Sequence, residues 1–125
     1  MVMNTPERTP LAQAYFRFLQ LAKAMESLKD SPTMDANEAA LLEAVVLRWH
    51  EGSPMTVREA IHLTELGSPA TLHKRVTRLR QKELLAAHSE PDDRRAKFLL
   101  PTQRALAYFD HLGRSIQEVR EAKPA

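Results

Sequence analysis

The sequence LGSPATLHKRVTRLRQKELL occupies residues 66–85, and its first residues are typical of a turn that opens into a helix. Ser68 is suited to a helix N-cap, and Pro69 follows at the first helical position, where its missing N–H has no intrahelical partner in any case. The apolar positions that would share one helix face are Leu72, Val76 and Leu79. The spacing predicts a helix over residues 68–82 with one buried face.

The opposite face of this predicted helix is small, polar and basic, and it carries no acidic residue. Its members are Ala70, Thr71, Lys74, Thr77, Arg78 and Gln81. Such side chains can approach a DNA groove, contact thymine methyl groups, and donate hydrogen bonds to phosphates or guanine edges. An ordinary solvated helix surface is the alternative, because most basic helices bind nothing.

The upstream sequence predicts two more helices, each opened by an N-cap side chain three residues before a glutamate. Asp35 precedes Glu38, and Thr56 precedes Glu59, which is the spacing of a capping box. Gly52 would end the first of these helices. The short helix after Thr56, the glycine-containing turn and residues 68–82 fit a helix-turn-helix, while the intervening Ser-Pro-Met is compatible with one short strand.

Two short apolar runs, residues 84–89 and 96–100, flank the charged sequence EPDDRR and predict a β-hairpin. Arg94 and Arg95 would lie at its tip, where a guanidinium can enter the negative minor groove. Asp93 is close enough in sequence to pair with Arg95 and orient it. Turn chemistry alone is the alternative explanation for the Pro-Asp-Asp sequence.

The two ends of the chain predict long amphipathic helices. From Leu11 to Leu28 apolar residues recur at intervals of three and four, and Tyr15, Leu19 and Ala22 widen that stripe. A similar spacing runs from Ala105 to Val119. We therefore expect a mainly α fold with a small β-hairpin (α+β).

The sequences LGSPATLHKRVTRLRQKELL and PDDRRAKFLLPT resemble the recognition helix and wing of the MarR (multiple antibiotic resistance regulator) family of winged helix-turn-helix transcription factors. The resemblance is densest over residues 56–102. It differs from the family where Glu83 stands in place of a common glycine and Pro101 in place of a common leucine. The resemblance implies a homodimer that binds a palindromic DNA operator, with a small-molecule effector of unknown identity as a possible further partner.

Together the pattern and the resemblance predict a single domain over residues 1–125. Residues 10–30 and 102–120 would be dimerisation helices, residues 35–100 the DNA-binding lobe, and residues 84–100 its wing. The predicted DNA contacts are Ser68, Ala70, Thr71, Lys74, Arg75, Thr77, Arg78, Gln81, Arg94 and Arg95, with Asp93 orienting the wing. The predicted dimer contacts are Leu11, Tyr15, Phe18, Leu21, Met25, Phe109, Leu112 and Ile116.

Positive charge is concentrated around these motifs. Residues 68–104 hold nine Lys and Arg side chains against four Asp and Glu, whereas the whole chain has a net charge of only +2. A polyanionic partner is the expected consequence. The sequence carries no signal peptide pattern and no apolar run of membrane-spanning length, which predicts a cytoplasmic protein without a membrane partner.

The residue inventory argues against an enzyme, and we predict no catalytic residue, metal site or cofactor. The chain has no cysteine and no Gly-rich phosphate loop, and its five histidines show no pairing at helical spacing. Two alternatives share the fold with a sequence-specific regulator: a winged-helix protein-interaction module and a non-specific architectural DNA-binding protein.

Overall fold

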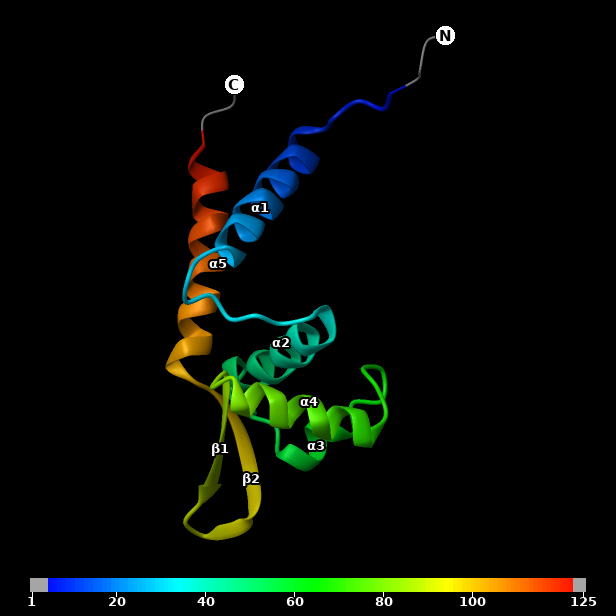
Figure 1. The fold of residues 1–125 in the computed structure, drawn as a ribbon, viewed down its shortest axis with the longest axis vertical. Coiled ribbons are helices and arrows are strands. Elements are labelled where there is room, and N and C mark those ends of the chain that lie inside the picture. Colours follow the sequence, from blue (N-terminus) through cyan, green and yellow to red (C-terminus); the bar gives the residue numbers. More distant parts are fainter. Residues whose placement is uncertain (1–4, 123–125) are drawn as a thin grey trace. The chain divides into compact units, whose positions relative to one another are not determined.

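The computed structural model describes residues 5–122, without the side chains of Asp93 and Arg94. In chain order the elements are α1 (Pro10–Glu26), α2 (Ala36–His50), α3 (Val57–Ile61), α4 (Pro69–Gln81), β1 (Leu85–Glu90), β2 (Asp93–Pro101) and α5 (Gln103–Glu121) (Figure 1). The chain forms two compact units. Unit 1 comprises Met1–Ser31 with Tyr108–Ala125, and unit 2 comprises Pro32–Ala107.

The helix starts of unit 2 follow the predicted capping chemistry. At α2 the backbone N–H of Glu38 donates to Asp35 Oδ1 at 2.8 Å, and at α3 that of Glu59 donates to Thr56 Oγ1 at 3.1 Å. In both capping boxes the glutamate also accepts from the N-cap N–H. Each box satisfies donors that the first helical turn leaves unpaired. Both predicted helix starts are confirmed.

Helix α4 begins as expected, with Ser68 as N-cap and Pro69 in the first turn. Its three predicted inward residues, Leu72, Val76 and Leu79, are all buried. Beyond its last helical residue the backbone reverses at Glu83, whose φ of +60° lies in the left-handed region. This is the position at which the resemblance has glycine, the residue that adopts this conformation at least cost.

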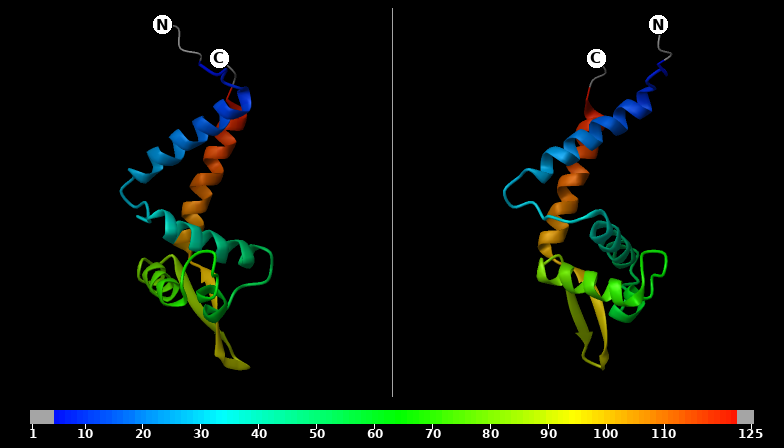
Figure 2. Two further views of the ribbon diagram at one scale, coloured as in Figure 1. Left: turned by 90° about the vertical axis from the view of Figure 1, so that its right-hand side faces the viewer. Right: turned by 45° about the vertical axis from the view of Figure 1, so that its right-hand side comes forward.

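The antiparallel hairpin β1–β2 is longer than the predicted strands. Pairing runs from Leu85 opposite Pro101 to Glu90 opposite Asp93, with a register shift after Ser89. Only Pro91 and Asp92 remain as the turn, so Arg94 and Arg95 belong to β2 and do not lie at the loop tip. The regular register ends at Ser89 opposite Lys97, and residues 94–96 lie outside that register, before the pair of Glu90 with Asp93. The extended backbone of β2 nevertheless continues through these residues, because the exposed end of a hairpin leaves charged side chains in water. Figure 2 shows the hairpin projecting from the helices of unit 2.

The predicted Ser-Pro-Met strand is reduced to a single bridge. Thr56 pairs with Phe98, and the N–H of Leu99 donates to the carbonyl of Met55 at 2.8 Å. A longer strand is blocked on both sides, because Pro54 has no N–H and Thr56 is already the N-cap of α3. The bridge nevertheless joins β2 to the start of α3.

The core of unit 2 is built from leucine and valine side chains that the helices and the hairpin bring together. Its fully buried members are Leu41, Leu42, Val45, Leu72, Leu79, Leu84 and Leu99. They come from α2, from α4 with the turn that follows it, and from β2. Burial of each such side chain contributes about 1.5–3 kcal/mol, so this core holds the exposed face of α4 and the base of the hairpin in place.

Unit 1 is packed very differently. Its helix α1 follows the N-cap Thr9 and ends at Glu26, four residues before the predicted end at residue 30. One side of α1 is covered, because Met25 is buried and Phe18 and Leu21 are half-buried. Other large apolar side chains of this helix are exposed, and the exposed fraction reaches 85% at Leu11. Part of the apolar surface of α1 is thus left uncovered by the described residues.

Candidate nucleic-acid interface

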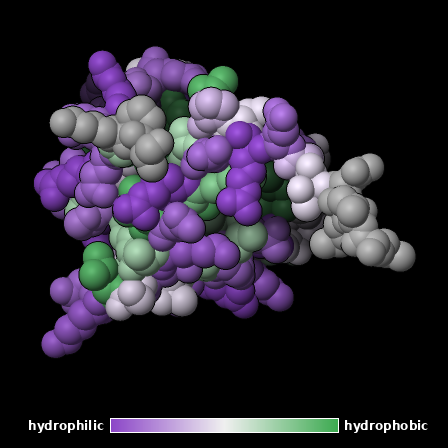
Figure 3. Space-filling view, turned by 90° about the horizontal axis from the view of Figure 1, so that it is seen from above, coloured by the Kyte–Doolittle hydropathy of each residue, from purple (hydrophilic) through white to green (hydrophobic). Residues whose placement is uncertain are grey.

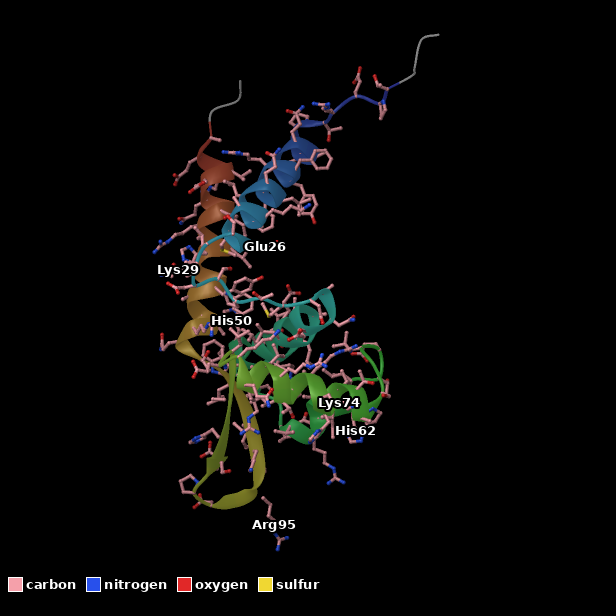
Figure 4. All side chains as sticks on the ribbon, viewed as in Figure 1. Glu26, Lys29, His50, His62, Lys74 and Arg95 are labelled. Carbon is pink, nitrogen blue, oxygen red and sulfur yellow. The ribbon has the colours of Figure 1, made fainter. Side chains whose placement is uncertain are left out.

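The outward face of α4 carries most of the predicted DNA contacts. Its exposed members are Ala70, Lys74, Thr77, Arg78 and Gln81, and Figure 4 labels Lys74 on this helix. The hydroxyl of Thr77 donates back to the carbonyl of His73 at 3.0 Å. The buried seam beneath holds this face toward solvent, as the helical spacing predicted.

Two of the predicted contacts take part in the helix start. Ser68 Oγ accepts from the N–H of Thr71 at 3.3 Å and donates to Thr71 Oγ1 at 2.9 Å. These hydroxyls hold the first turn of α4, where the backbone N–H groups and the positive end of the helix dipole favour an anion.

Arg75 lies apart from the outward face. Its side chain is half-buried, and Nη1 donates to the carbonyl of Leu66 at 2.8 Å. The same nitrogen lies 3.2 Å from where a β-carbon on Gly67 would stand, and Gly67 has a φ of +153°. Arg75 therefore fixes the glycine turn before α4. Helical spacing alone predicted it as a DNA contact, because spacing does not reveal a hydrogen bond to a residue nine positions away.

Lys82 is also committed inside the fold. Its ammonium group lies 2.7 Å from Glu38 Oε2 and donates to the carbonyl of Thr33 at 2.7 Å. The positive charge that the sequence concentrates in residues 68–104 is thus partly neutralised within unit 2. The cations of the outward face and the hairpin carry the rest.

A hollow of about 620 Å³ lies among α3, α4 and β2. Its basic lining consists of Arg58, His73, Arg80, Arg95 and Lys97. We call this set the cationic hollow. Sequence reasoning had named only Arg95 as a site residue. Only weak sequence patterns could have identified the others. Lys97 lies two residues after Arg95, the spacing of one strand face, and His73 and Arg80 lie two turns apart on one side of a helix.

A second hollow of about 490 Å³ lies between the C-terminal half of α4 and β1, and it is lined by Thr77, Arg80, Gln81, Leu85, Ala86 and Ala87. Arg80 borders both hollows, although the sequence had given it no role. The concave surface therefore continues along the flank of α4 that faces the hairpin.

The wing residues are only partly described. The side chains of Asp93 and Arg94 lie outside the described residues, so the predicted Asp93–Arg95 pair stays a prediction. Arg95 is exposed on β2, and Figure 4 shows it extending outward from the far part of the hairpin. It lines the same hollow as His73, the neighbour of Lys74 in sequence. Arg95 and the flank of α4 that carries His73 and Arg80 thus line one hollow.

The predicted dimer contacts divide by exposure. Leu11, Tyr15 and Ile116 are exposed; Phe18, Leu21, Phe109 and Leu112 are half-buried; and Met25 is buried within the protomer. Met25 therefore supports the fold and offers little surface to a partner. Phe16, which is not among the predicted dimer contacts, is 52% exposed. Figure 3 shows hydrophobic residues exposed among hydrophilic ones.

Metal-ligating groups and membrane-spanning helices are both absent from the described part of the chain. Residues 5–122 contain no group of three or more His, Asp or Glu side chains arranged to hold a metal ion. None of the helices in this range combines the length and the hydrophobicity needed to cross a bilayer.

No family model and no curated protein matches this sequence. Solved structures do share its fold. The transcriptional regulator Tm0710 from Thermotoga maritima aligns at a TM-score of 0.55 with 20% identity, over 91% of this chain and 78% of that one. A probable transcriptional regulator from Pseudomonas aeruginosa aligns at 0.51 with 22% identity, over 88% and 76%.

The YusO protein from Bacillus subtilis aligns at 0.51 with 18% identity, over 88% of this chain and 70% of that one. At such identities a structural likeness establishes the fold. This chain therefore has the mainly helical, winged helix-turn-helix fold of these solved structures, which confirms the fold that its resemblance to the MarR family implied.

Proposed function

We propose that this chain is a MarR-like transcriptional regulator that binds double-stranded DNA in a sequence-specific manner as a homodimer. The observation that carries the proposal is that α4 takes part in two basic surfaces of unit 2: its own outward face and, through His73 and Arg80, the cationic hollow beside β2. The fold supports it, because two of the solved structures that share it are described as transcriptional regulators.

In this proposal α4 enters the major groove. Lys74 and Arg78 project from its outward face with the amide of Gln81, so they reach base edges or phosphates once the helix is in the groove. Ala70 and the methyl group of Thr77 suit contact with thymine methyls. Ser68 lies at the helix start, where a phosphate oxygen is favoured.

The cationic hollow would receive the sugar-phosphate backbone between the two grooves. Its basic side chains come from three separate elements: Arg58 from α3, Arg80 from α4 and Lys97 from β2. Contacts to phosphate fix the register of a protein on the duplex without reading sequence. Arg95 then reaches the adjacent minor groove from β2, with Asp93 as its predicted orienting partner.

Homodimer formation would use the uncovered apolar side chains of unit 1. Leu11, Tyr15 and Ile116 are each more than half exposed, and a second copy would remove them from water. Twofold symmetry then presents two α4 helices to successive major grooves about 34 Å apart, which matches a palindromic operator. Repression by occupying a promoter is the simplest consequence.

Selection of duplexes from a random pool tests this function most directly. We expect a palindromic consensus, and affinity for it should fall roughly 10³- to 10⁵-fold between 50 and 200 mM salt if about six to ten phosphates are contacted. A steep salt dependence without any selected sequence would favour the architectural DNA binder. Absence of DNA binding would favour the protein-interaction module.

Alanine substitutions distinguish residues that read bases from residues that contact the DNA backbone. Arg95→Ala should weaken binding to all sequences, whereas Lys74→Ala or Arg78→Ala should change preference by about 1–3 kcal/mol at one base position if the side chain reads a base. Arg80→Ala should reduce the salt slope by about one without changing the selected sequence. Lys29→Ala removes the same single positive charge from the loop before α2, and it should leave the salt slope and the selected sequence unaltered. Unchanged affinity for Arg95→Ala would remove the wing from the proposal.

A further inference from the structure

The C-terminal end of α4 is bound to both segments through which unit 2 continues into unit 1. The chain enters unit 2 at Pro32 and leaves it after Ala107. Next to the entry, the carbonyl of Thr33 accepts a 2.7 Å hydrogen bond from Lys82 Nζ. Next to the exit, Arg104 Nη1 donates to the carbonyl of Lys82 at 3.0 Å. One residue thus contacts both connections.

Further hydrogen bonds join the turn after α4 to the start of α5, and we call this set of contacts around Lys82 the junction. The hydroxyl of Thr102 donates to the carbonyl of Glu83 and accepts from the N–H of Ala105 at 3.1 Å, so the cap of α5 is also a bond to the end of α4. The N–H of Thr102 donates to the carbonyl of Leu84 at 3.2 Å. The start of α5 and the end of α4 are therefore held as one body.

The ammonium group of Lys82 is bound by α2 and by the segment that precedes it. Its partner Glu38 is only 4% exposed and belongs to the capping box at the start of α2. An ammonium group has three donors, and here one goes to Glu38 and one to Thr33. Both bonds direct Nζ toward α2 and the entry segment. This use differs from that of Lys74 on the outward face.

We infer that Lys82 is a positioning residue that sets the direction of α4 relative to the two connections, and so sets the half-site spacing that a dimer accepts. The inference rests on the proposed DNA-binding function and deepens it. Lys82 bonds to the entry segment at Thr33 through its side chain and to the exit segment at Arg104 through its carbonyl. A displacement of either segment is therefore passed on to the C-terminal end of α4. Lys82 itself contacts no base in this account.

The test separates positioning from stability and from phosphate contact. Lys82→Met removes the ammonium and leaves a buried carboxylate, so it should unfold at lower urea concentration. The double variant Lys82→Met with Glu38→Gln removes that unpaired charge and keeps a capping-box side chain at position 38. Lys29→Met serves as the matched control for loss of one lysine charge.

Each protein is titrated with duplexes that carry two selected half-sites at separations varied by single base pairs, and with one half-site alone. We expect the wild type and Lys29→Met to prefer one separation. The double variant should regain most of the urea midpoint and keep the wild-type salt slope. Its preference among separations should nevertheless fall by about fivefold or more, the lower range of typical coupling between sites.

Three results would overturn the inference. Wild-type preference among separations in the double variant would show that Lys82 acts only through stability. A salt slope reduced by about one would make Lys82 a phosphate contact. Equal affinity of the wild type for every separation would remove the coupling itself. Failure of the wild type to bind any selected duplex would instead refute the proposed function, so the two failures are distinguishable.

Discussion

Unit 2 and unit 1 place their apolar residues in opposite environments. Leu41, Leu72 and Leu79 of unit 2 have no exposed surface, whereas Leu11 and Tyr15 of unit 1 are 85% and 58% exposed. Both sets stand at helical spacing in the sequence. The difference shows that an amphipathic pattern predicts which face is apolar and leaves open whether the same chain covers that face.

Apolar side chains have different roles in the two units. In unit 2 the core orients α4 and β2, whose outward side chains form the candidate interface. In unit 1 the side chains of Leu11, Tyr15 and Ile116 remain largely in water, at a cost that a partner surface would relieve. The stability of unit 2 should therefore depend on interior packing, and the assembly of the protein on the surface of unit 1.

The largest effect is expected for Leu79→Ala in the core of unit 2. Loss of the buried side chain leaves a cavity and should lower the free energy of unfolding by about 2–5 kcal/mol. Leu11→Ala in unit 1 should change the stability of the isolated protomer by less than about 0.5 kcal/mol, because surface substitutions rarely cost more. Urea unfolding of both variants at low protein concentration measures the contrast. Equal losses would contradict the division between the units.

Tyr15→Asp tests the surface of unit 1 directly. A carboxylate in the apolar stripe of α1 should weaken self-association by about 2 kcal/mol or more, which is about 30-fold in the dissociation constant. Sedimentation over a concentration series measures the change. Gln20→Asp introduces the same charge on the polar side of α1 and should associate like the wild type. If both variants associated normally, another surface would form the dimer.

A smaller gain in stability is expected for Glu83→Gly at the end of α4. The φ of +60° is strained for glutamate and allowed for glycine, so the substitution should raise the free energy of unfolding by about 0.5–1 kcal/mol. Gly52→Ala is the reciprocal control, because Gly52 has a φ of +83° with no atom within 4 Å of the added carbon. It should lose stability through backbone strain alone. Destabilisation by Glu83→Gly would mean that its side chain has a role of its own.

The smallest effect concerns the N-cap of α2. The backbone N–H of Glu38, donating to the carboxylate, lowers the pKa of Asp35 below its usual 3.8. A lowered carboxyl pKa contributes stability that is present above 3.8 and is lost as the pH falls through the folded-state value. The stability difference between the wild type and Asp35→Asn should therefore shrink on acidification below pH 3.8. Urea midpoints across that range measure it, and a constant difference would contradict the assignment.

Local sequence rules predicted the elements well because their causes are local. The caps at Asp35, Thr56 and Ser68 act within one helical turn, and the buried seam of α4 follows from helical spacing. The hairpin was placed correctly, but β2 begins at Asp93, earlier than predicted, because the chain stays extended beyond the regular register to one more pair, between Glu90 and Asp93. A local pattern does not show a pair that is separated from the rest of the ladder.

The candidate site was less predictable, since its members are distant in sequence. The outward residues of α4 followed from one helix, whereas the cationic hollow joins α3, α4 and β2 and brought in Arg58, Arg80 and Lys97. Arg75 and Lys82 carry the same charge as Lys74, and their long-range partners withdraw them from the outward face.

Composition, spacing and capping were thus sufficient for the order of the elements, the buried face of α4 and the concentration of positive charge, because each depends on neighbours within a turn or a strand. Which cations face outward depended on packing between elements far apart in the chain. A side chain of several rotatable bonds takes its direction from the partners within its reach. Those partners, such as Glu38 for Lys82, are brought near only when the whole unit has folded.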